Sequence, residues 1–323
     1  MLSRVADSLY WMSRYLERAE HTARLLDVNL NLMLDESLTS SERRWHRVLH
    51  ALSNPAHVEW QGDPYSLTQS LAFDMSNKAS IVSCVAAARE NSRHVREQIS
   101  TEQWQRLNSL YLYVIRPEVR RDGLMTELAQ PVEFLQSVME AIHQFQGVTD
   151  STMSHGEGWQ FIQVGRYIER ANATAMLLQA YHDDLWRHPE RIPDGSEYLE
   201  WMGLLRSATA FEAYCKVYTA DLTADRILEF LLLDEKFPHS MRFAIDSMEH
   251  ALEAIHRGSG KRPEALRRLG GKLQALLSYS SVEDILSQDV VACLRDIQMQ
   301  CSAIHDMIYK LYVDYSIQTA LAG

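Results

Sequence analysis

Residues 14–26 read RYLERAEHTARLL, and residues 166–178 read RYIERANATAMLL. Arg, Tyr, Glu, Arg, Ala, Thr, Ala, Leu and Leu recur in register between these two stretches. An internal repeat can decide the whole architecture of a protein, so it is the first feature to interpret. This repeat predicts two related halves, each of which carries one Arg-x-x-Glu-Arg cluster on a long helix.

The first copy of the repeat has the periodicity of a helix that is buried on most sides. Arg14, Glu17 and Arg18 lie opposite its apolar stripe, but Trp11 and Leu25 share their side of the helix. A helix that is apolar around most of its circumference is usually buried, and buried charges must be paired or bound to a ligand. The apolar stripe, with steps of three and four residues, consists of Leu2, Val5, Leu9, Met12, Leu16, Ala19, Ala23, Leu26 and Leu30.

We expect the halves, residues 1–148 and 149–323, to form a single domain with pseudo-twofold symmetry. Their motifs would then meet as a cluster with excess positive charge, and the planar fork of Arg suits carboxylate and phosphate groups. This predicts a pocket for a phosphate, a carboxylate or the acidic chain end of a partner. The alternative is an internal ion-pair network that fixes helix register, because such networks resemble functional sites. The cluster would contain Arg14, Glu17, Arg18, Arg166, Glu169 and Arg170.

Composition narrows the class of protein. The chain has 323 residues, of which 46% are hydrophobic and 23% charged, enough for one large or two moderate domains. The net charge is −11 and no lysine-rich stripe is present, so nucleic acid is not expected as a partner. The apolar runs are too short to span a bilayer, so no membrane is expected either. The cysteines lack metal-type Cys-x-x-Cys spacing and indicate free thiols in a reducing cytoplasm; they are Cys84, Cys215, Cys293 and Cys301.

Helical periodicity dominates the chain, and alternating strand patterns are absent. We therefore predict an all-α fold, a large helical bundle whose two pseudo-repeated halves pack around a common core. The first helix should cover residues 3–33. A helix over 131–146 should end at Gly147, and another should cover 196–218.

Several stretches together resemble one known family. Residues 2–12 read LSRVADSLYWM, residues 88–91 read AREN, residues 152–155 read TMSH and residues 165–171 read GRYIERA. With the paired Glu-Arg motifs, they are similar to the bacterial alpha-E family, an all-helical family named for that motif. The resemblance covers essentially the whole chain. It implies that Glu17, Arg18, Glu169 and Arg170 are the functional positions.

The resemblance also implies partners. Alpha-E proteins tend to be encoded beside, or fused to, a circularly permuted ATP-grasp ligase, and a transglutaminase-like cysteine peptidase often lies nearby. The family is thought to act in forming or modifying a peptide or amide linkage. No glycine-rich phosphate loop follows a strand in this sequence. We therefore expect no cofactor on this chain, and ATP with Mg²⁺ on the partner ligase.

Three functions remain open. In the first, the chain is a binding subunit of an ATP-grasp amide ligase, and its Arg-Glu cluster holds an anionic peptide, a small anionic substrate or the ligase itself. In the second, it is a stand-alone enzyme with Glu17 or Glu169 as general base. The third is a metal-dependent helical-bundle enzyme, because Glu140-x-x-His143 and Glu253-x-x-His256 have the spacing of di-metal bundles. We predict no metal ligands.

Other side chains are candidates for the site. His155 precedes the second motif and could act as acid or base, or else cap a helix. Arg89 could add a third basic arm to the cluster, or lie on a solvated helix face. Asn77 offers a polar group at a helix N-terminus. The aromatic candidates for lining a pocket, which could equally belong to the core, are Trp11, Tyr15, Trp159 and Tyr167.

Overall fold

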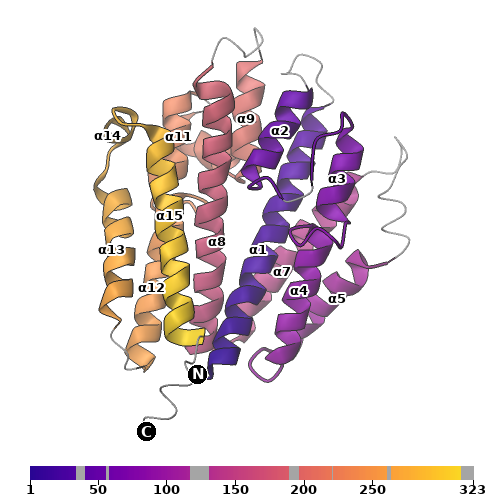
Figure 1. Ribbon diagram of the computed structural model, residues 1–323, viewed down its shortest axis with the longest axis vertical. Helices are drawn as coiled ribbons and strands as arrows, with labels where there is room; N and C mark the ends of the chain where they lie inside the picture. Colours follow the sequence, from indigo (N-terminus) through magenta and orange to yellow (C-terminus); the bar gives the residue numbers. More distant parts are fainter. Residues whose placement is uncertain are drawn as a thin grey trace.

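The two repeated stretches form two long helices that lie side by side at the centre of the molecule (Figure 1). They are α1, Ser3–Leu32, and α8, Glu157–Tyr181. The computed structural model describes residues 1–33, 41–55, 58–116, 131–188, 196–219, 221–259 and 263–313. Every regular element in these ranges is a helix, which confirms the predicted all-α class.

The remaining helices surround this central pair. Along the first part of the chain they are α2 (Ser41–Ala51), α3 (Pro64–Ala72), α4 (Ile81–His94), α5 (Thr101–Val114) and α7 (Pro131–Thr152). After α8 come a π-helical turn η1 (His182–Trp186), α9 (Glu197–Ser207), α10 (Phe211–Tyr218), α11 (Ala224–Leu233), α12 (Met241–Ser259), α13 (Glu264–Tyr279), α14 (Val282–Leu286), α15 (Val290–Ile308) and a second π-helical turn η3 (Tyr309–Val313).

The central helices run parallel and in register. At their N-terminal ends, the amino group of Met1, just before α1, lies 2.9 Å from Oε2 of Glu157, the first residue of α8. Further along both helices, Arg170 Nε donates to Glu17 Oε1 at 2.5 Å. Parallel, in-register packing is the arrangement that places the two motifs at the same height.

The backbones of the two helices approach each other closely at the residues just before the motifs. A Cβ atom on Gly165 would lie 2.3 Å from the carbonyl oxygen of Tyr10, so only glycine fits there. At the corresponding position of α1, Ser13 Oγ donates to the carbonyl oxygen of Ile162 at 2.7 Å. The two contacts are reciprocal, since each helix presents a carbonyl group to the same repeat position of the other.

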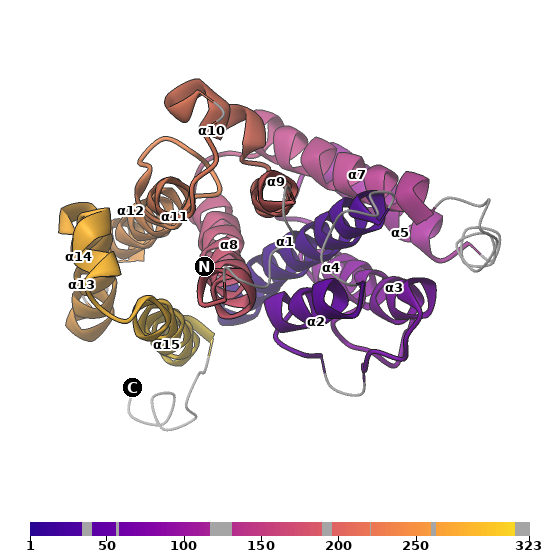
Figure 2. The same cartoon turned by 90° about the horizontal axis from the view of Figure 1, so that it is seen from above.

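The outer helices divide into two groups around this pair (Figure 2). The helices α3, α4 and α5 lie on the α1 side, whereas α11 to α15 lie on the α8 side. Most buried apolar side chains of both groups belong to one continuous cluster, so the predicted common core is confirmed. The wider pseudo-repeat of residues 1–148 and 149–323 stays a prediction. No helix in the described ranges has the length and hydropathy needed to cross a bilayer.

Two predicted helices were wrong in their extent. Gly147 does not end a helix, because α7 continues through it to Thr152 and Thr149 Oγ1 donates to the carbonyl oxygen of Phe145 at 2.8 Å. The predicted helix over 196–218 breaks into α9 and α10 at Thr209, which has a left-handed φ of 54°. A β-branched residue rarely adopts that conformation, so nothing in the local pattern signalled the break.

Candidate functional site

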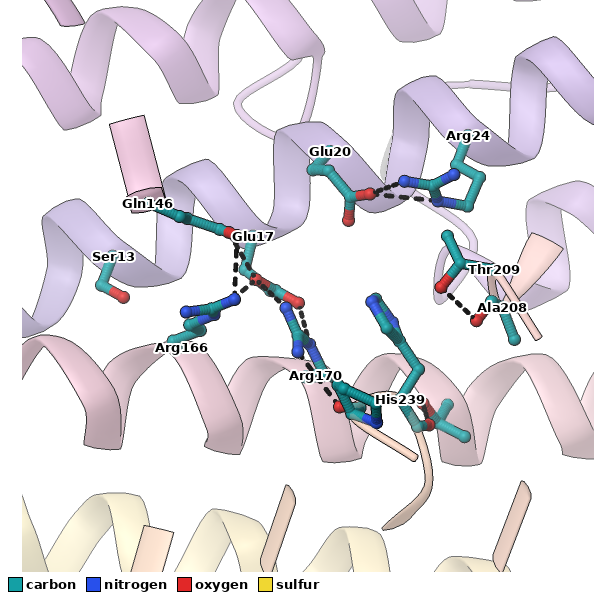
Figure 3. A network of polar contacts seen from close by, with 12 residues as sticks. Ser13, Glu17, Glu20, Arg24, Gln146, Arg166, Arg170, Ala208, Thr209 and His239 are labelled. Atoms are coloured by element: carbon teal, nitrogen blue, oxygen red, sulfur yellow. Dashed lines mark hydrogen bonds and ion pairs between the residues drawn. The ribbon is translucent and has the colours of Figure 1, made fainter. Parts of the chain in front are cut away.

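The two motifs meet in two groups of ion pairs, one around Glu17 and one around Glu169, which together we call the motif cluster. Figure 3 shows the group around Glu17. Each motif glutamate is held by the motif arginine of the other helix: Arg170 Nε donates to Glu17 Oε1 at 2.5 Å, and Arg18 Nε donates to Glu169 Oε1 at 2.7 Å. The predicted meeting of the motifs is therefore confirmed. The cluster consists of Arg14, Glu17, Arg18, Arg166, Glu169 and Arg170, so its four guanidiniums outnumber its two carboxylates.

The Glu17 side of the cluster is sealed. Arg170 Nη2 donates to Glu17 Oε2 at 3.1 Å, and Arg170 Nη1 donates to the carbonyl oxygen of Pro238 at 3.0 Å. Gln146 of α7 bridges the remaining contacts, because its Oε1 accepts from Arg166 Nη2 at 2.9 Å and its Nε2 lies 3.5 Å from Glu17 Oε2. The side chains of Glu17 and Arg170 are only 3% and 4% exposed. Each of the three guanidinium nitrogens of Arg170 thus donates a hydrogen bond within the protein.

The Glu169 side is held as firmly but is more open. Arg14 Nε donates to Glu169 Oε2 at 2.7 Å, while Arg18 Nε donates to the other oxygen. The side chain of Glu169 is 7% exposed, and that of Arg18 is 31% exposed. Burial raises the pKa of Glu169, but the guanidiniums of Arg14 and Arg18 outweigh this effect and hold the pKa below its ordinary value. With both oxygens bound, this carboxylate is suited to anchoring guanidiniums rather than to accepting a proton.

A cavity of about 340 Å³ opens beside Arg18, between α1, α8 and the loop after α2. Within the described part of the chain, the Arg18 Nη1 and Nη2 atoms donate no hydrogen bond, so they are available to a ligand. The side-chain amides of Asn172 and Asn54 also lack a hydrogen-bond partner among those residues. Other lining residues include His21, Leu52, Pro55, Leu71 and Met176.

A histidine that was not predicted for the site, His21, also lines this cavity. The Nε2 atom of His21 is buried, and no residue in the described ranges bonds it. Burial lowers the pKa of His21 to about 4, so the ring is neutral at pH 7. The signal for this residue was a difference between the copies, because Ala173 occupies the equivalent position of the second one.

A second ion pair adjoins the cluster and was also missed (Figure 3). Glu20 accepts from the guanidinium of Arg24, and His143 Nε2 of α7 lies 3.5 Å from Glu20 Oε1. Burial raises the pKa of Glu20, but Arg24 and the neighbouring histidines outweigh this effect and hold the pKa well below its ordinary value. His239 lies close by, and burial together with Arg170 lowers its pKa. This pair is internally neutral and adds no net charge to the cluster.

Three of the predicted aromatic residues flank the cluster. The Arg14 guanidinium lies 4.7 Å from the ring centre of Trp11, and the Arg18 guanidinium lies 5.9 Å from that of Tyr15. Both α8 guanidiniums lie 5.5 Å from the ring centre of Tyr167. These cation–π contacts orient the arginines.

The structure places His155 and Trp159 outside the cluster, at the turn between α7 and α8. Their rings stack with centres 4.2 Å apart, and both contact Asp150. His155 Nε2 lies 3.1 Å from the Asp150 carbonyl oxygen, and Trp159 Nε1 donates to Asp150 Oδ1 at 3.2 Å. These contacts fix the corner between the two helices. The prediction that His155 is catalytic gains no support from them.

Arg89 and Asn77 also lie apart from the cluster. Arg89 Nε donates to Asn108 Oδ1 at 3.1 Å, and its guanidinium lies 4.7 Å from the Tyr111 ring centre, so it joins α4 to α5. Asn77 Nδ2 donates to the carbonyl oxygen of Ser70 at 3.2 Å. Asn77 therefore ties the turn before α4 to α3.

The two Glu-x-x-His pairs do not converge. His143 faces Glu20, whereas Glu140 accepts from Gln144 at 3.2 Å on an exposed surface. Among the residues that the structure describes, no group of three or more His, Cys, Asp or Glu side chains could hold a metal ion. The metal-dependent alternative gains no support from these side chains. The four cysteines are free.

Comparisons with known proteins agree with this architecture. The alpha-E family, described as a predicted alpha-helical domain with a conserved ER motif, matches residues 1–313. Uncharacterized proteins of Mycobacterium bovis and Mycobacterium tuberculosis are 25% identical over 299 residues, covering 87% of this chain and 33% of their own length. This chain thus spans about a third of the length of the curated relatives it matches. No solved structure matches it.

Proposed function

This chain belongs to the alpha-E family, and from that premise we propose that it is a helical partner or subunit of an ATP-grasp-dependent system that forms or modifies a peptide or amide bond. The cavity beside Arg18 holds an anionic group of a peptide or small substrate, or of the partner. The partner is a circularly permuted ATP-grasp protein, which binds ATP and Mg²⁺. A transglutaminase-like peptidase is a further candidate partner, and the system operates in the cytoplasm.

The state of Arg18 carries this proposal. Its Nε is fixed by Glu169 at 2.7 Å, and Arg18 lines the cavity. Its Nη atoms donate no hydrogen bond in the described part of the chain. A guanidinium held along one edge is already oriented, so an anion that binds the other edge loses little conformational entropy. Arg170, at the same motif position in α8, uses all three nitrogens on Glu17 and Pro238.

The chemistry of the cavity favours holding a substrate over transforming it. Glu169 has both oxygens bound and a lowered pKa. His21 has a pKa of about 4, so it is a weak base at neutral pH. The stand-alone enzyme with Glu17 or Glu169 as general base therefore has less support. A substrate held here would need to be activated by another protein, and ATP-driven activation by a ligase meets that need.

The anion site can be tested by titration with acetate and with inorganic phosphate, followed by calorimetry or by NMR shifts. We expect the wild-type chain to bind at least one of these anions, and Arg18→Gln to lower the affinity at least tenfold. Arg93→Gln is the matched control, since Arg93 is an exposed arginine of α4 whose one ion pair among the described residues is with Glu90. Equal affinities for wild type and Arg18→Gln would reject the cavity as an anion site.

The partnership needs a separate test. The chain would be co-expressed with the circularly permuted ATP-grasp protein of the same genome, and complex formation and ADP release would be measured. We expect a complex whose amide-forming activity falls at least tenfold in Arg18→Gln. Absence of a complex together with turnover of a peptide by this chain alone would favour the stand-alone enzyme instead.

A further inference from the structure

If the cavity binds an anion, as the proposed function requires, the charge beside it bears on which kind of anion fits. Arg18 and Glu169 line the cavity, and Arg14 holds Glu169 from behind it. The carboxylate of Glu169 neutralises one of these two guanidiniums, so the group beside the cavity carries one excess positive charge. His21 adds none, because its ring is neutral at pH 7. A phosphate monoester carries about −1.5 to −2 charges at pH 7, whereas a carboxylate carries one. The single excess charge matches a carboxylate.

The other polar groups of the cavity suit an amide. Asn172 lies three residues after Glu169 on α8, so it shares a face of the helix with that residue. Its side-chain amide and that of Asn54 offer both donors and acceptors, and in the described ranges no protein group uses them. A bare anion needs no acceptor from the protein, whereas a neighbouring peptide group needs both a donor and an acceptor.

The rest of the cavity is apolar and roomy. Leu52, Pro55, Leu71 and Met176 contribute hydrocarbon surface to the lining. The volume of about 340 Å³ reaches the lower range of small-molecule sites and is far larger than acetate or phosphate requires. An apolar side chain of the ligand would cover this surface and release water from it.

We propose that the cavity binds the carboxyl end of a peptide, or an N-acylated amino acid, that carries an apolar side chain. The carboxylate pairs with the Nη atoms of Arg18, and the adjoining amide pairs with Asn172. The apolar side chain packs against Leu71 and Met176. This ligand class has the free carboxylate that an ATP-dependent ligase activates before it forms an amide bond.

Four probes separate the contributions: N-acetyl-L-leucine, acetate, inorganic phosphate and N-acetyl-L-leucinamide, each titrated into the full chain by calorimetry. We expect N-acetyl-L-leucine to bind at least tenfold more tightly than acetate or phosphate. The leucinamide, which lacks the carboxylate, should bind at least tenfold more weakly than N-acetyl-L-leucine.

Variants then assign the amide contact. Asn172→Ala should lower the affinity for N-acetyl-L-leucine about fivefold, as expected for loss of one hydrogen bond, and leave the affinity for acetate unchanged. Asn172→Asp keeps the size of the side chain and should weaken both acids by charge repulsion. Asn31→Ala is the control, because Asn31 is exposed at the end of α1 and, among the residues that the structure describes, donates to Asp27 alone.

The outcomes separate this inference from the proposed function. If acetate or phosphate binds as tightly as N-acetyl-L-leucine in an Arg18-dependent way, the peptide-like ligand is rejected and the anion site stands. If neither the acids nor phosphate binds, both proposals fail. If Asn172→Ala leaves every affinity unchanged, the assignment of the amide contact is overturned.

Discussion

The two copies of the motif have the same Arg-x-x-Glu-Arg pattern but opposite surroundings. The Glu17–Arg170 pair is covered by Gln146 of α7 and the Pro238 carbonyl group before α12, and both side chains are nearly inaccessible. The Glu169–Arg18 pair faces a cavity, and Arg18 is 31% exposed. One pair therefore fixes the packing of the central helices, and the other holds an arginine ready for a ligand. Identical motifs can thus take different roles when neighbouring helices cover only one of them.

The sealed pair should be the more critical for stability, and this is the largest effect that we predict. Arg170→Met would leave the Glu17 carboxylate buried without its main partner, and breaking a buried pair costs about 3–5 kcal/mol. Arg18→Met removes a partly exposed arginine and leaves Arg14 on Glu169, so it should cost about 1 kcal/mol. Urea unfolding of both variants measures the difference.

The double variant Glu17→Gln with Arg170→Met is the control for this prediction. It removes both charges of the sealed pair, so it should recover part of the stability lost in Arg170→Met. Equal losses of stability for Arg170→Met and Arg18→Met would show that the two pairs are equivalent in solution, contrary to their different burial.

The tight contact between α1 and α8 gives the second contrast, between Gly165 and the equivalent Ser13. Gly165→Ala places a methyl group where a Cβ would lie 2.3 Å from the Tyr10 carbonyl oxygen, so the helices must separate. Such overpacking costs about 1–3 kcal/mol. Ser13→Ala at the equivalent position of α1 removes one hydrogen bond and should cost about 1 kcal/mol. Thermal unfolding of the two variants tests the order, and a stable Gly165→Ala protein would contradict the tight contact.

The third and smallest effect depends on pH and on His21, which the second copy replaces with Ala173. The pKa of His21 is lowered by burial from 6.5 to about 4. Between these pH values the unfolded chain binds a proton that the folded chain does not, so the stability falls as the pH falls. From pH 7 to 4, the wild type should lose about 1–2 kcal/mol more than His21→Ala, since partial exposure of the ring reduces the effect.

Urea titrations at several pH values measure this difference between the wild type and His21→Ala. His46→Ala controls for the loss of an imidazole, because the His46 side chain is 59% exposed on α2. Parallel stability curves for wild type and His21→Ala would contradict the lowered pKa of His21.

The spacing of apolar residues predicted which segments are helical better than it predicted where the helices end. The stripe from Leu2 to Leu30 predicted α1 to within a residue, because the regular spacing of apolar residues in a long amphipathic helix indicates where the helix lies. The break at Thr209 and the continuation of α7 through Gly147 escaped prediction. The intrinsic preference of a single residue is a weak guide to where a helix ends, because its context can override that preference.

The charged residues of the motif cluster were predictable from the sequence, but the other residues that line the cavity were not. The repeat identified all six charged members of the motif cluster, because equivalent positions of parallel, in-register helices must face each other. Asn54 and Asn172 were missed, because an isolated asparagine carries no periodic signal. His155 and Arg89 have suitable chemistry, but their neighbours Asp150 and Asn108 hold them elsewhere.

The amino-acid sequence alone determined that this protein is all helical and that two Arg-x-x-Glu-Arg motifs would be buried together. Periodicity and the cost of burying unpaired charge are properties of the chain itself. The tertiary structure alone decided which motif is sealed and which opens into a cavity. That choice depends on where Gln146, Pro238 and the loop at Asn54 come to lie, and these segments are distant in sequence from both motifs.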